Sequence, residues 1–290
     1  MRGRTSTLPL TIIALLLVQA CAARDPQPAA QRPAQQRYQT TATVLQDKSH
    51  GPELCLSGVL DSLPPQCGGV PVTNWRWDQV DGEESRNGTT WGVYRVVGTY
   101  DGTSFTVVET GAPERQPPPS AQERFEDEPK TPCQEPEGGW KVPDPAHRSE
   151  RYLEPVSKAA EAEPDFAGLW LSYLGPMGDN VAEDPGEFVL NVAFTGDLAR
   201  HETQLRSRWG GRLCVTRQQR TYRELLRIQR QLQGSAGKEL GLRVLGTSVD
   251  EYANAVDLQV VVLEERERAA LEARYGGGAV ETTAALTPLA

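Results

Sequence analysis

Cysteine, histidine and carboxylate side chains are the groups in this chain that could carry out chemistry. The sequence has 290 residues, with five cysteines and three histidines. It contains no nucleophile elbow, phosphate loop, H-E-x-x-H zinc motif or dinucleotide-binding fingerprint. His201 lies among charged residues of a predicted helix, which favours a solvated or partly buried helix position over a general base. The sequence therefore identifies no catalytic residue, and an enzyme with a site built from ordinary carboxylates remains the alternative.

The N-terminal segment has the pattern of a secretory signal peptide. Arg2 and Arg4 form a short basic head, and the apolar run from Leu8 to Val18 follows it. Such a run is too short to span a bilayer as a permanent helix. We therefore expect residues 1–20 to be a signal peptide.

Cys21 follows this segment directly and is a candidate for lipidation. Ala20 before Cys21 resembles the bacterial lipobox, in which the cysteine is acylated and becomes the first mature residue. This resemblance implies a palmitate-bearing lipoprotein anchored to the extracellular face of the cell membrane. The alternative is an ordinary signal peptide cut close to Cys21, which would leave this thiol free or remove it.

Four cysteines remain once Cys21 is assigned to the lipid, an even number in an oxidising compartment. Three connectivities are open, and we predict the disulfides Cys55–Cys67 and Cys133–Cys214. A metal site is not expected, because no C-x-x-C occurs and His50, His147 and His201 are scattered. We also expect no cofactor.

Two segments are predicted to be spacers. Residues 21–39 are rich in proline, glutamine, alanine and arginine, so we expect a disordered tether behind the lipid. Residues 111–147 form an acidic, proline-rich linker that should be mostly disordered. Its far end, with Cys133 and the stretch 138–140, is expected to be pinned onto the domain that follows.

Residues 40–110 are predicted to form a small all-β domain. Short alternating or β-branched runs are separated by turn residues, and we expect strands over 41–45, 54–60, 91–97 and 104–108. Asp101-Gly102 predicts a two-residue hairpin, and Asn87-Gly88 marks another turn. Four or five strands in so short a segment indicate a curled sheet or barrel similar to an OB-fold.

Three tryptophans of this region are a candidate binding surface. Trp75, Trp77 and Trp91 lie close together in the sequence, and exposed rings would form a platform for carbohydrate or peptide. The alternative, which we favour, is that they pack the core of the β domain.

An acidic turn follows the first two tryptophans. Asp78, Asp81, Glu83 and Glu84 surround Gly82, which raises the question of a calcium site. The spacing fits no calcium loop known to us, so we interpret the segment as a solvated turn.

Residues 148–288 are predicted to form an α+β domain with an internal repeat. An offset of 66 residues places Leu205 on Leu271, Trp209 on Tyr275 and Gly210 on Gly276. Each copy is expected to run helix–strand–strand–helix–strand, with the helices on one face of a mixed sheet. The repeated positions are apolar or capping residues, so we expect the domain to be a binding surface and not an active site.

Two partial family resemblances concern this domain. The stretch 254–288 resembles the C-terminal half of α-lytic-type protease pro-regions, which implies a folding chaperone or inhibitor. The doubled element order is similar in topology to double BON-domain lipoproteins, which bind phospholipid. The wider organisation resembles uncharacterised lipoproteins of high-GC Gram-positive bacteria, which implies a location and no activity.

The overall charge restricts the partners. The formal net charge is -9, which repels nucleic acid and anionic lipid alike. We expect a non-enzymatic binding or interaction module that is bound to the membrane through its lipid, with another envelope protein as the candidate partner. The alternatives are an extracytoplasmic hydrolase with a carboxylate-based site and a pro-region-like inhibitor or chaperone.

Overall fold

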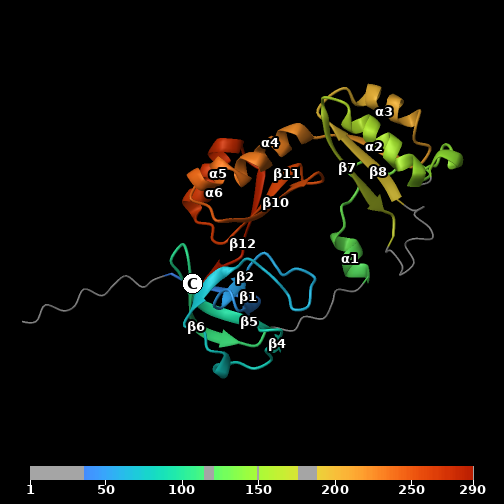
Figure 1. Ribbon diagram of the computed structural model, residues 1–290. Helices are drawn as coiled ribbons and strands as arrows, with labels where there is room; N and C mark the ends of the chain where they lie inside the picture. The colour runs from blue at the N-terminus through green and yellow to red at the C-terminus, as the bar shows by residue number, and fades with distance from the viewer. Residues whose placement is uncertain (1–35, 114–120, 149, 176–187, 290) are drawn as a thin grey trace, which may run out of the picture. The chain divides into compact units, whose positions relative to one another are not determined.

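The computed structural model describes residues 36–113, 121–148, 150–175 and 188–289. Cys21, the predicted signal peptide and most of the predicted tether lie outside these ranges. The chain is a mixed α+β protein with one seven-stranded sheet and two three-stranded sheets (Figure 1). No helix within the described ranges is long and apolar enough to cross a membrane.

The seven-stranded sheet, sheet A, contains nearly all of the predicted β domain. Its strands follow the order β13-β1-β2-β3-β6-β5-β4, and β1 also pairs with β5. The strands are β1 (Arg37–Gln46), β2 (Glu53–Cys55), β3 (Val70–Thr73), β4 (Glu84–Arg86), β5 (Thr89–Tyr100), β6 (Phe105–Gly111) and β13 (Thr287–Pro288).

The β1–β5 pairing makes sheet A ring-like, but the predicted barrel is wrong. The pairings of β2 with β3 and of β3 with β6 each register only two residue pairs. Pro71, inside β3, also has no backbone N–H to donate. A continuous barrel wall needs longer ladders than these, so the fold is not a closed barrel of the OB type.

The strand boundaries differ from expectation at three places. β1 begins at Arg37, inside the predicted tether, because Tyr38 packs into the core of sheet A and pairs with Gly98 and Pro288. β2 ends at Cys55, so only the first two residues of the predicted strand over 54–60 belong to a strand. The loop after β5 has four residues and not two, because the Asp101 carboxylate accepts hydrogen bonds from the backbone of Thr103 and Ser104.

The acidic linker contains a short helix, α1 (Ala121–Asp127), where disorder was expected. After it, Cys133 pairs with Cys214 at a Cα–Cα distance of 5.8 Å, which ties the linker to the next domain. Cys55 pairs with Cys67 at 5.7 Å. Both predicted disulfides are confirmed.

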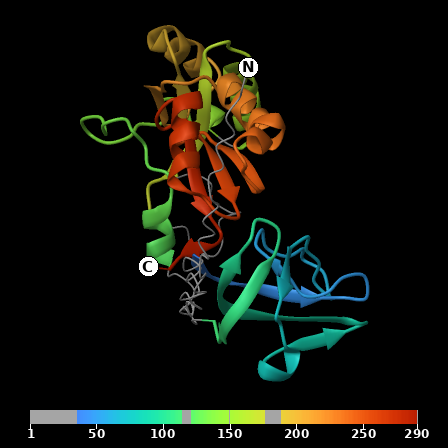
Figure 2. The same ribbon diagram turned by 90° about the vertical axis from the view of Figure 1, so that its left-hand side faces the viewer.

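The remaining elements form two halves with the same element order. The first half contains α2 (Leu153–Glu161), β7 (Phe166–Tyr173), β8 (Phe188–Phe194), α3 (Leu198–Arg206) and β9 (Leu213–Arg217). The second half contains α4 (Tyr222–Gln233), the additional α5 (Ser235–Glu239), β10 (Val244–Asp250), β11 (Ala255–Val260), α6 (Glu265–Tyr275) and β12 (Val280–Ala284). Figures 1 and 2 show the helices of each half beside its own sheet.

The pairing pattern is also the same in the two halves. The first two strands are antiparallel, and the third is parallel to the second. Each antiparallel pair has a β-bulge at the same place, between Phe166 and Gly168 in the first half and between Val244 and Gly246 in the second. Bulges re-aim a strand at one point, so a shared bulge matches the two sheets more closely than element order alone.

The helix boundaries follow local chemistry. α4 begins with a capping box, in which the Thr221 side chain accepts from Glu224 N and the Glu224 side chain accepts from Thr221 N. Gly276 ends α6 at φ 87°, as predicted for a glycine cap. Gly210 has no such role, because α3 already ends at Arg206; a Cβ there would lie 2.2 Å from Asp144 O.

Candidate functional site

The strongest candidate site is a hollow at one edge of β5, which we call the Trp91 hollow. One edge of β5 pairs with β1 along its length, whereas the other is shared by two short partners. β4 registers with β5 as far as Trp91, and β6 registers from Arg95 onward. The backbone from Gly92 to Tyr94 therefore has no strand beside it on this edge.

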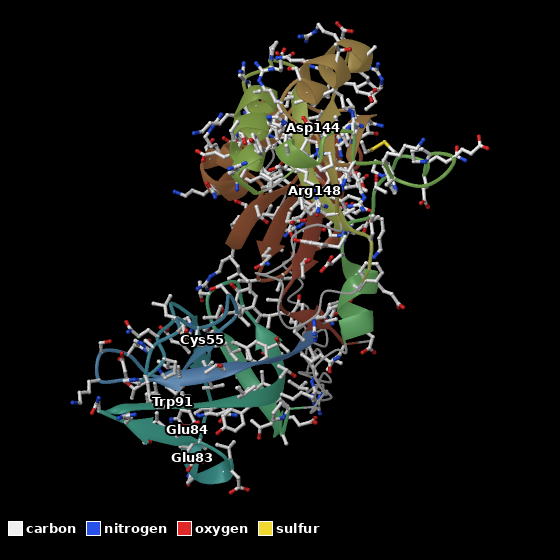
Figure 3. The ribbon with its side chains drawn as sticks, turned by 90° about the vertical axis from the view of Figure 1, so that its right-hand side faces the viewer. Cys55, Glu83, Glu84, Trp91, Asp144 and Arg148 are labelled. Carbon is white, nitrogen blue, oxygen red and sulfur yellow. A yellow bond between two sulfur atoms is a disulfide. The ribbon has the colours of Figure 1, made fainter. Side chains whose placement is uncertain are left out.

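The hollow has a volume of about 580 Å³. Trp91, Val93 and Tyr94 line it from β5, and Asp81 and Glu84 line it from the acidic turn and β4. Glu84 pairs with Trp91 in the β4–β5 register, and Figure 3 shows Glu83, Glu84 and Trp91 along this part of the sheet. The volume lies within the range of small-ligand sites in proteins.

Tyr94 gives the hollow an unused polar group. Its side chain is 3% exposed, and its hydroxyl is buried without a hydrogen-bond partner among the described residues. Burial raises the pKa of Tyr94, and the nearby charges of Glu83 and Asp81 raise it further. The phenol therefore stays neutral at physiological pH and can donate or accept a hydrogen bond.

Gly92 is required for this arrangement. A Cβ at position 92 would lie 2.5 Å from the Tyr94 hydroxyl oxygen, because the tyrosine ring folds back along its own strand. Alternation along a strand puts residues 92 and 94 on the same face. Glycine at 92 thus makes room for the buried phenol.

The charge around the hollow is negative. Asp81 and Glu84 are exposed acids of the lining, and no lysine, arginine or histidine is among the lining residues that the structure describes. Val93 is 49% exposed and adds an apolar surface. Apolar and aromatic lining residues with acids beside them favour a ligand that combines a positive charge with an alkyl or planar group.

The three predicted tryptophans do not form one platform. Trp75 and Trp77 are partly buried and meet edge to face at 5.3 Å, and both contact the ring of Tyr94. Trp77 Nε1 donates to Gln46 Oε1 at 2.8 Å, whereas Trp75 Nε1 is buried without a partner among the described residues. Trp91 packs in a separate cluster with Leu45 and the Cys55–Cys67 disulfide.

The acidic turn does not gather into a metal site. Asp78 is paired with Arg76, whose hydrogen bond lowers the pKa of the Asp78 carboxyl. In the described ranges, only Glu163, Asp165 and His201 bring three potential ligand atoms within 4.8 Å of one another. The calcium hypothesis for residues 78–84 therefore gains no support.

The His201 group is an ion-pair network. His201 is 1% exposed, its ring stacks on Phe194 at 3.6 Å, and its Nε2 lies 2.9 Å from Asp165 Oδ2. The Arg200 guanidinium lies 3.0 Å from both Glu163 and His201 Nε2, and its hydrogen bond lowers the pKa of Glu163. These contacts tie α3 to the residues just before β7, and the Arg200 guanidinium supplies the positive charge beside Glu163.

Glu251 is a partly buried carboxylate with a raised pKa. It lies in the turn between β10 and β11, and burial is the main reason that its pKa is raised. Its Oε2 accepts a hydrogen bond from Leu169 N at 2.5 Å. Glu251 does not line the Trp91 hollow, and its contacts join the second half to the first.

Sequence reasoning missed Tyr94 and the open edge of β5. The Trp91-Gly92-Val93-Tyr94 run does carry a signal, since a lone glycine inside a strand marks a close approach. The open edge carries none, because it depends on which strands pair with β5.

A scan against protein-family models gives no match to this chain, and a search of curated proteins finds no similar sequence.

Proposed function

We propose that this protein is a lipid-anchored, extracytoplasmic binding module without enzymatic activity. Two disulfides support an oxidising compartment, since such bonds are rare in the cytosol. The signal-peptide pattern and the lipobox at Cys21 supply the anchor in this proposal. The proposed partner is another envelope protein.

The Trp91 hollow carries the proposal. Trp91, Val93 and Tyr94 line it from β5, with Asp81 and Glu84 beside them, and Val93 is the exposed apolar side chain of this set. A lysine or arginine fits this set, because its alkyl stem can pack on Val93 while its charged head meets the carboxylates. The ligand is therefore a basic side chain carried by an exposed segment of the partner.

A peptide titration tests the binding. A labelled alanine-based peptide with one central lysine should bind the full-length protein, and the same peptide with glutamate in place of lysine should not. The double variant Asp81→Asn/Glu84→Gln should weaken lysine-peptide binding by about tenfold, because exposed ion pairs contribute up to roughly 1 kcal/mol each. Fluorescence anisotropy gives the dissociation constants.

A matched variant controls for overall charge. Asp61→Asn/Glu281→Gln removes two exposed acids that do not line the hollow, so its affinity should equal that of the wild type. Equal weakening in both double variants would mean diffuse attraction and would refute the hollow as the site. Equal binding of the lysine and glutamate peptides would refute the proposed ligand.

Cell fractionation tests the anchor. In cells that express the full-length chain, the wild type should stay with the membrane fraction, and Cys21→Ala should be released into the medium. Release of both proteins to the same extent would contradict lipidation at Cys21.

A further inference from the structure

We infer that the second half contains an anion site that takes the phosphate group of a small solute. The site is a hollow of about 290 Å³ where α4 meets the end of α6, and we call it the Arg220 hollow. Arg220, Arg227 and Arg274 line it, together with Tyr275 and one acid, Glu224. It shares no residue with the Trp91 hollow and is independent of the proposed function.

Positive charge in this hollow is only partly neutralised. The Arg220 guanidinium donates to the backbone carbonyls of Gly277, at 2.7 Å, and Gly278, at 3.2 Å. Carbonyls fix the position of this cation without cancelling its charge. Arg227 is exposed, and Arg274 is paired with Glu239 at 2.8 Å.

The one acid of the lining is already in use. Glu224 accepts hydrogen bonds from Thr221 N, at 3.2 Å, and Thr221 Oγ1, at 3.4 Å, in the capping box of α4. Its carboxylate therefore faces the helix start. Among the described residues, the lining has three arginines against this single glutamate, in a protein whose formal net charge is -9.

Tyr275 gives independent support for a ligand. Its hydroxyl is buried and has no hydrogen-bond partner among the described residues. A buried hydroxyl without a partner destabilises the free protein, and an acceptor oxygen of a bound anion would satisfy it once the Tyr275 ring turns toward the hollow. A phosphate group offers several such oxygens and a negative charge for the arginines.

The position of Tyr275 is open in the second half, whereas the equivalent position in the first half is covered. Trp209 occupies the position of Tyr275, and its Nε1 donates to Arg212 O at 3.0 Å. The segment before α2 covers it, because Asp144 N donates to Gly210 O and Gly210 N donates to His147 O, both at 3.0 Å. In the second half, a Cβ added to Gly276 or Gly277 would meet nothing within 4 Å.

The concave shape favours a soluble ligand over a flat surface. A hollow of this volume holds a phosphate group with a small attached fragment. The chemistry alone would also accept the phosphate of a lipid headgroup, so the experiment must separate these two sources.

Isothermal titration of the full-length protein with inorganic phosphate, at constant ionic strength in sodium chloride, tests the site. We expect saturable binding at one site. Arg227→Gln should weaken it by about tenfold, as expected for loss of one charge-assisted hydrogen bond. Tyr275→Phe, which removes only the hydroxyl, should weaken it severalfold while the protein stays folded.

Arg223→Gln is the matched control. Arg223 is an exposed arginine one turn earlier on α4 and does not line the hollow, so its loss should change the affinity less than twofold. Equal losses for Arg223→Gln and Arg227→Gln would overturn the inference, as would the absence of saturable binding at millimolar phosphate. Binding to phosphatidylglycerol vesicles without binding of soluble phosphate would also overturn it.

Discussion

The two halves of the α+β domain share the same order and pairing of helices and strands, which we call the frame. They differ in what their polar residues do. Leu205 and Leu271 are both buried, and both sheets have the same bulge. The halves differ just after these leucines. Trp209 is 2% exposed and covered, whereas the equivalent Tyr275 borders an open hollow. The frame thus sets the fold, and the residues placed on it decide which half can take a ligand.

A second difference lies at the equivalent helix position. His201 of α3 and Glu267 of α6 are both buried polar residues, at the same offset as the leucines. His201 Nε2 contacts the side chains of Arg200 and Asp165, whereas Glu267 accepts a hydrogen bond from Glu264 N at the start of its own helix. The equivalent helix position therefore makes a contact between elements in the first half and caps its own helix in the second.

The largest effect on stability should come from the loss of the Cys133–Cys214 disulfide. Among the described residues, the first half has this disulfide and the second half has no counterpart. The double variant Cys133→Ala/Cys214→Ala opens a crosslink with a sequence separation of 81 residues. We expect the free energy of unfolding to fall by about 4 kcal/mol, since longer loops lose more chain entropy when they are closed. Urea unfolding measures the change.

The short crosslink is the comparison for this variant. Cys55→Ala/Cys67→Ala opens a separation of only 12 residues, so its loss should be smaller, about 3 kcal/mol. A larger loss from the short crosslink would show that loop length does not govern these bonds.

Truncation of the paired leucines tests whether the frame is equally important in both halves. Leu205 is 2% exposed and Leu271 is 3% exposed, so each alanine variant should leave a similar cavity. We expect Leu205→Ala and Leu271→Ala each to lower the free energy of unfolding by about 3 kcal/mol. If one variant lost less than half as much free energy of unfolding as the other, the two halves would be equivalent in topology but not in packing.

Much of this frame could be predicted from sequence because its signals are local. The capping box at Thr221, the glycine after Tyr275 and the order of helices and strands all depend on residues a few positions apart. The two disulfides were also predicted correctly, from the even number of cysteines and their distribution over the domains. Gly210 differs from Gly276, because its constraint is the approach of Asp144 and not its own backbone angle.

The arrangement of sheet A could not be predicted in the same way. The ring depends on β1 meeting β5, and the last strand, β13, returns to pair with β1. Such contacts between distant segments leave no periodic trace in the sequence. The Trp91 hollow exists because β4 and β6 occupy the same edge of β5, so only its residue types, and not its existence, could be anticipated.

Substitution of Trp209 and of Tyr275 by phenylalanine should affect stability differently in the two halves. Trp209→Phe removes ring volume and the hydrogen bond to Arg212 O, so we expect a loss of about 2 kcal/mol. Tyr275→Phe removes a buried hydroxyl without a partner, so stability should be unchanged or higher by up to about 1 kcal/mol. Thermal unfolding without added phosphate measures both. A loss above 1 kcal/mol for Tyr275→Phe would contradict an unsatisfied hydroxyl.

The smallest expected effect is a pH dependence at the contact between the halves. Glu251 packs on the bulge of the first half, where a Cβ at Gly168 would lie 2.8 Å from Glu251 Cβ. The pKa of Glu251 is raised from 4.5, mainly by burial, so the folded state holds this proton more tightly than the unfolded state does. Its contribution to stability is therefore full below the unfolded value and is lost as pH rises through the folded one.

Glu251→Gln keeps an acceptor for Leu169 N and cannot ionise, so it should escape that loss. The variant and the wild type should be equally stable near pH 4, and the variant should become the more stable one as the pH approaches 7. Urea unfolding at pH 4, 5.5 and 7 measures the difference between the two proteins, which removes the opposite trend from carboxyls with lowered pKa such as Asp144. Glu272→Gln, an exposed acid of α6, should show no such divergence. A wild type more stable than Glu251→Gln at pH 7 would mean that the charged carboxylate stabilises the contact between the halves.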